Sequence, residues 1–112
     1  MTTHPSLGHF HPLVPLAAAL RAAGHEAAFA ASRSFCPTAE ALGFPCFPAG
    51  FDRRGIPWGR LFPAMAGATG EAWATFMEVD LFAGFLAQLA VPDYAAIGRA
   101  WRPDLIVREA FE

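Results

Sequence analysis

The chain has 112 residues, of which 54% are apolar, and its formal net charge is −2. This length allows one small domain with a hydrophobic core, and the apolar content excludes a disordered chain. All eight basic residues are arginines and they form no cluster, so no nucleic-acid or anionic-membrane partner is indicated. No apolar stretch reaches the ~18 residues of a membrane span, and no secretory signal is recognisable. The composition therefore predicts a cytoplasmic protein without a membrane span.

Short strands and helices are predicted to alternate in the first half of the chain. Residues 1–4 could only end a strand, so we expect that strand to begin before Met1. A helix should follow Pro12 and end before Gly24, which suits the left-handed residue after a helix. The next predicted elements are a strand at 26–31, a helix at 34–42 that stops at Gly43, and a strand at 45–48. This alternation predicts an α/β fold.

The second half is predicted to be a loop followed by two helices and a strand. Residues 51–70 are rich in glycine and read as a mobile loop. An apolar helix over 71–89 should be buried or face an apolar ligand. We expect Pro92 to interrupt it, Asp93 to cap a last helix, and Pro103 to end that helix. The apolar run 105–107 is typical of a strand buried on both faces.

The loop before the first helix is the best candidate for chemistry. Gly8 would allow a tight turn there, and Pro12 would shape the entry to the helix. His9 would then lie on a strand-to-helix loop, where α/β proteins place functional groups. An imidazole with an ordinary pKa near 6.5 can accept a proton at neutral pH. The alternative is a loop histidine that caps the helix or bonds the backbone.

This loop and two later stretches resemble one enzyme family. The first stretch reads Gly8-His9-x-x-Pro12-x-x-Pro15-Leu16-Ala17-x-x-Leu20-x-x-x-Gly24-His25-Glu26, and the others run over 44–50 and 101–109. Together they resemble the N-terminal domain of the family 1, UDP-glycosyltransferase-like glycosyltransferases of the GT-B fold. The bacterial enzymes that glycosylate macrolides, enediynes and other natural products are the most similar in pattern. The resemblance implies a partial Rossmann-like parallel sheet, the first half of an acceptor-binding domain over 1–112, with the C-terminal donor-binding domain absent.

The resemblance also implies a reaction and its residues. A hexose would pass from a nucleotide diphosphate sugar to a hydroxyl of a small apolar acceptor, with inversion and without a cofactor. His9 would be the general base, and Glu109 would orient it, in place of the family's aspartate. Glu109 could instead pair with Arg108, and Glu112 is a neighbouring carboxylate. The candidate acceptor-binding side chains, which could equally be core, are Phe10, Trp58, Phe62, Trp73, Phe76 and Met77. The chain alone should be inactive and poorly stable.

Three further readings of the sequence stay open. His9 and His11 form a His-x-His pair, but a metal site would need a third ligand such as His4, and no metal is predicted. Cys36 and Cys46 fit no zinc spacing and are expected to be buried free thiols. The alternative functions are a non-catalytic helper or remnant of a glycosyltransferase-like protein, and another nucleotide-dependent α/β enzyme such as a reductase. A single glycine in 6–12, where a dinucleotide loop has three, argues against the reductase.

Overall fold

The computed structural model describes residues 1–52, 54 and 56–109, and it confirms the α/β class. β1 (Phe29–Ala31) and β2 (Cys46–Pro48) pair in parallel. Thr2 extends this sheet, because it forms parallel bridges to Ala30 on one side and to Arg108 on the other. The order across the sheet is therefore the segment 105–109, the N-terminal segment, β1 and β2. Doubly wound Rossmann-like folds have this order, with the fourth segment beside the first.

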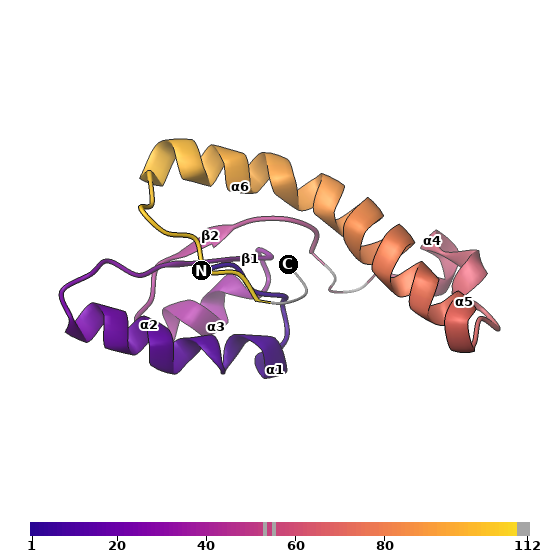
Figure 1. Ribbon diagram of the computed structural model, residues 1–112, viewed down its shortest axis with the longest axis horizontal. Coiled ribbons are helices and arrows are strands. Elements are labelled where there is room, and N and C mark those ends of the chain that lie inside the picture. The colour runs from indigo at the N-terminus through magenta and orange to yellow at the C-terminus, as the bar shows by residue number, and fades with distance from the viewer. Residues whose placement is uncertain (53, 55, 110–112) are drawn as a thin grey trace.

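The main hydrophobic core lies between the sheet and three short helices. These are α1 (Leu7–Phe10), α2 (Leu13–Ala22) and α3 (Cys36–Glu40), which Figure 1 shows on one side of the strands. The core side chains are Phe10, Ala17, Phe29, Ala39 and Phe44. Because the helices bury only one stripe each, most of their other side chains are exposed.

The predicted ends of the first two helices, at Gly24 and Gly43, are confirmed, and α2 shows why. Gly24 has a φ of 89°, and its N–H donates to the carbonyl of Arg21 at 3.0 Å. The N–H of His25 donates to the carbonyl of Leu20, also at 3.0 Å. These two bonds form a Schellman motif, which satisfies carbonyls that a helix end leaves unpaired. Gly43 likewise follows α3 with a φ of 79°.

The second half contains more helix than the sequence predicts. The region 51–70 contains α4 (Trp58–Leu61) and the 3₁₀ turn η1 (Pro63–Met65). One continuous helix then runs from Gly70 to Trp101, built from α5 (Gly70–Thr75), the π-helical η2 (Phe76–Leu86) and α6 (Ala87–Trp101). Figure 1 shows α6 over the face of the sheet opposite α2 and α3.

The predictions for Pro92 and Asp93 are wrong. Pro92 lies inside α6 without interrupting it. Proline removes the hydrogen bond to the carbonyl four residues earlier, which here belongs to the exposed residue Gln88. Asp93 caps no helix; its carboxylate accepts a hydrogen bond from the N–H of Gly50 at 2.9 Å. Asp93 therefore connects α6 to the segment that follows β2.

The segment 105–107 is also not the strand that the sequence predicts. Leu105 and Ile106 are 70% and 63% exposed. The segment contacts the sheet through the backbone of Thr2, whose N–H donates a hydrogen bond to the carbonyl of Val107 at 2.8 Å. The side chains of Leu105 and Ile106 are therefore not buried on both faces of the sheet as the sequence predicts.

The helix from Gly70 to Trp101 is long and apolar enough to cross a membrane, judged by length and composition. The sequence, read for uninterrupted apolar runs, predicts no such segment. One helix of this kind is weak evidence for a membrane span, because the core helix of a water-soluble domain passes the same test.

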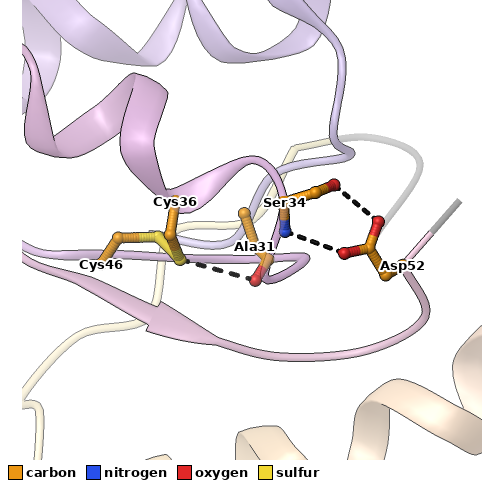
Figure 2. The surroundings of a disulfide bond; sticks show 5 residues. All are labelled: Ala31, Ser34, Cys36, Cys46 and Asp52. Carbon is orange, nitrogen blue, oxygen red and sulfur yellow. Dashed lines mark hydrogen bonds between the residues drawn. A yellow bond between two sulfur atoms is a disulfide. The ribbon is translucent and has the colours of Figure 1, made fainter. Parts of the chain in front are cut away.

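The prediction that the two cysteines are free thiols is wrong. Cys36, at the start of α3, and Cys46, at the start of β2, form a disulfide with their Cα atoms 5.3 Å apart. α3 packs against β2, which brings the two positions within bonding range. Figure 2 shows the disulfide and, beside it, a contact between Ser34 and Asp52.

Ser34 and Asp52 are joined by two hydrogen bonds. The hydroxyl of Ser34 donates to one carboxylate oxygen at 2.6 Å, and its N–H donates to the other at 2.9 Å. The Ser34 hydroxyl, and next the N–H of Arg54, hold the pKa of the Asp52 carboxyl below its usual value. This contact holds the segment after β2 against the turn that leads into α3.

Candidate functional site

His9 and Glu109 lie side by side, although they come from opposite ends of the chain. Nδ1 of His9 is 3.0 Å from Oε1 of Glu109, and their side chains are 31% and 15% exposed. His9 is held within α1, where its N–H donates to the carbonyl of Ser6 at 3.1 Å. The pair is therefore partly buried but accessible, as a proton-transfer site requires.

The pair lies where a doubly wound sheet binds its ligands. His9 follows the N-terminal segment and Glu109 ends the segment 105–109, and these two segments are parallel neighbours through Thr2. Both residues are thus at the carboxyl ends of adjacent segments, where the strand order reverses. Loops diverge at such a point and leave a crevice for ligands.

His4 is the residue of this site that the sequence analysis did not single out, except as a conceivable metal ligand. Its ring centroid is 5.0 Å from that of His9 and 5.8 Å from that of Phe82 in η2. His4 therefore lies between the His9–Glu109 pair and the long helix. The signal in the sequence is its position at the end of the N-terminal segment, just before Pro5.

A cavity of about 410 Å³ extends from His4 between the sheet and the long helix. Its lining is mainly apolar and comes from the N-terminal segment, β1, β2 and the residues after it, η2, α6 and the segment 103–108. The lining residues include His4, Ser32, Phe82, Tyr94 and Trp101. A cavity of this size is in the range of small-molecule sites.

The chain is similar to known proteins over nearly its whole length. No family model matches the chain. It is 32% identical to tylactone mycaminosyltransferase of Streptomyces fradiae over 123 aligned positions, which cover 92% of this chain and 27% of that protein. It is 32% identical to aklavinone 7-beta-L-rhodosaminyltransferase of Streptomyces galilaeus, with the same coverage. L-demethylnoviosyl transferase of Streptomyces niveus is 33% identical, over 100% of this chain and 28% of that protein.

A solved structure agrees with these relatives. SsfS6, a glycosyltransferase of Streptomyces sp. SF2575, superposes with a TM-score of 0.60 and 28% identity, over 92% of this chain and 30% of that one. The chain is homologous to part of a natural-product glycosyltransferase. The resemblance to glycosyltransferases of the GT-B fold is thereby confirmed. The chain spans little more than a quarter of the length of the curated relatives it matches.

The prediction that Phe10 contacts an acceptor is wrong. Phe10 is 0% exposed, and its ring packs edge-to-face on Phe29 at 4.8 Å and on Phe35 at 5.4 Å. It belongs to the core beneath the sheet and cannot contact an acceptor. The reason is the helical conformation of α1, which exposes His9 and turns the next residue inward.

The other predicted acceptor residues form a separate aromatic cluster. Trp58 and Phe62 stack at 6.0 Å, and Phe76 lies 5.4 Å from Phe62 and 6.2 Å from Trp73. Met77, the next residue of η2, is half-buried. None of these five residues lines the cavity next to His4. Their role in acceptor binding stays a prediction.

Gly8 does not provide the tight turn that the sequence predicts. It lies within α1, it has no left-handed φ, and a Cβ at this position would meet no atom within 4 Å. A side chain would therefore be tolerated there. Pro12 is the residue before α2, where its missing N–H costs little.

The remaining predictions concern metals and competing carboxylates. Among the described residues, no group of three or more histidine, cysteine, aspartate or glutamate side chains could hold a metal ion. His11 is exposed, and its ring lies 5.9 Å from that of Phe10. Glu112, the other carboxylate near Glu109 in sequence, lies outside the described residues.

Proposed function

We propose that this chain supplies the acceptor side of a glycosyl transfer, in which His9 is the general base and Glu109 positions it. The observation that carries the proposal is the 3.0 Å contact between Nδ1 of His9 and Oε1 of Glu109. A carboxylate on one ring nitrogen fixes the orientation of the ring and stabilises the imidazolium that forms when the other nitrogen accepts a proton.

The proposed reaction moves one proton and one glycosyl group. Nε2 of His9 takes the proton of an acceptor hydroxyl while the oxygen attacks the anomeric carbon of a nucleotide diphosphate sugar. The bond from that carbon to the diphosphate oxygen breaks, and the nucleoside diphosphate leaves with its electron pair. Attack from the face opposite the leaving group inverts the anomeric configuration. The sugar donor is a substrate in this scheme, and no resident cofactor is required.

We further propose that the chain is the first half of the N-terminal, acceptor-binding domain of a cytoplasmic glycosyltransferase. The donor site would belong to a C-terminal domain outside this sequence. The two relatives named for tylactone and aklavinone transfer sugars to those acceptors, as their names state. The apolar cavity beside His4 supports an acceptor of similar apolar character for this chain.

The test is the substitution His9→Ala in the protein that carries this chain. We expect transfer to a hydroxyl acceptor to fall by about 10²–10⁴-fold, because a positioned general base contributes that much. His11→Ala is the matched control, since His11 is exposed and contacts Phe10 rather than Glu109. Thermal melting should be unchanged in both variants. Near-normal transfer by His9→Ala would remove His9 as the base, and a protein with no transfer activity at all would favour a non-catalytic helper.

A further inference from the structure

Resting on the proposed function, we infer that Ser32 is the polar anchor of the acceptor site and selects acceptors with an oxygen on an apolar body. Ser32 follows β1 and is only 3% exposed. Its hydroxyl has no hydrogen-bond partner among the residues that the structure describes, and Ser32 is one of the residues that border the cavity beneath α6. A buried hydroxyl without a partner leaves the free energy of its desolvation uncompensated. A ligand that bonds the hydroxyl recovers that free energy.

The Ser32 hydroxyl takes no part in the local turn and caps no helix in the described part of the chain. The carbonyl of Ser32 accepts hydrogen bonds from the N–H groups of Phe35 and Cys36 at 2.8 and 3.2 Å, which fixes the turn into α3. No side chain caps α3. Two residues on, the hydroxyl of Ser34 bonds to Asp52 at 2.6 Å. The backbone of Ser32 thus fixes its place at the border of the cavity, and its hydroxyl takes no part in that turn.

The surroundings of Ser32 define the class of ligand. Apolar side chains from the sheet, η2 and α6 make up most of the cavity wall, so the body of the ligand should be apolar. His4 lines the same cavity, and its ring lies 5.0 Å from that of His9. A ligand anchored at Ser32 would therefore extend toward the proposed base. A site with a buried polar group discriminates strongly against analogues that lack the matching oxygen.

A pair of probes tests this inference without any sugar donor. 2-Naphthol and naphthalene differ by one hydroxyl. Their dissociation constants can be measured by fluorescence titration of the protein that carries this chain, with the chain unaltered or carrying Ser32→Ala or Ser6→Ala. We expect the ratio of the two constants to favour 2-naphthol in the unaltered chain and to fall about tenfold in Ser32→Ala. The ratio should be unchanged in Ser6→Ala, because Ser6 does not line the cavity and its hydroxyl caps no helix.

Thermal melting without a probe gives a second readout. Ser32→Ala should melt at the same temperature as the unaltered chain or higher, because the substitution removes a buried hydroxyl that has no partner. An unchanged probe ratio in Ser32→Ala, or no binding of either probe to the unaltered chain, would overturn the inference. A lower melting temperature would show that Ser32 bonds within the protein and would also overturn it. His9→Ala should keep the probe ratio, so failure of the proposed base and failure of the anchor are distinguishable.

Discussion

The backbone N–H of Glu109 donates a hydrogen bond to the carbonyl of Thr2 at 3.2 Å. The N–H of Thr2 donates in turn to the carbonyl of Val107 at 2.8 Å. These two bonds hold the segment that ends in Glu109 beside the segment that leads to His9. Parallel backbone pairing between segments from opposite ends of the chain therefore helps to bring the carboxylate of Glu109 to the imidazole of His9.

Substitutions of Glu109 should separate positioning from binding. In the protein that carries this chain, we expect Glu109→Gln to lower kcat by about 10- to 100-fold with little change in KM, which is less than the loss of the base itself. Glu109→Asp keeps the charge and should recover part of the rate. Steady-state kinetics with a hydroxyl acceptor measure both. Equal losses in Gln and Asp variants, or an effect confined to KM, would contradict a positioning role.

Phe10→Ala should destabilise the fold rather than alter acceptor binding. Phe10 is fully buried against Phe29 and Phe35, so truncation should lower the free energy of unfolding by about 3–5 kcal/mol. The control is Leu7→Ala in the same helix, because Leu7 is 53% exposed and its loss should cost within about 0.5 kcal/mol. Urea unfolding measures both values. Equal stability of the two variants would contradict the placement of Phe10 in the core.

Gly50 lies close to α6, and its substitution can be compared with that of the open Gly8. Gly50 has a φ of 69°, and a Cβ there would come within 3.2 Å of the Cβ of Ala90 in α6. Gly50→Ala should therefore lower stability by more than about 1 kcal/mol. Gly8→Ala should be neutral or stabilising, since Gly8 is helical and open to solvent. Thermal melting compares them, and a strongly destabilised Gly8→Ala would restore the tight-turn interpretation.

The disulfide predicts a redox-dependent stability. Cys36 and Cys46 close a loop with a sequence separation of 10, so the bond should contribute about 2–3 kcal/mol by constraining the unfolded chain. The double variant Cys36→Ser/Cys46→Ser should melt lower than the oxidised chain and similarly to the reduced chain. Mass spectrometry after thiol alkylation reports the oxidation state. Two freely alkylated thiols in the native, unreduced chain would show that the bond does not form.

Local patterns in the sequence were sufficient for α2 and α3, although not for α1, where a tight turn was expected. Gly24 and Gly43 end α2 and α3 because the left-handed conformation after a helix favours glycine, a preference that needs no tertiary contact. The sequence also predicts the strand β2, and Pro103 marks the end of α6. The family motif also singled out His9 and Glu109, and the structure places them in contact.

Tertiary structure alone decided which side chains are buried and which residues they contact. The disulfide depends on α3 packing against β2, the burial of Phe10 on the orientation of α1, and the contact of Asp93 on the position of α6 over Gly50. His4 and Ser32 belong to no sequence motif. They were singled out because both border the cavity between the sheet and the long helix. Sequence encodes backbone preferences over a few residues, whereas burial and side-chain partners depend on segments that are distant in the chain and meet only in the folded molecule.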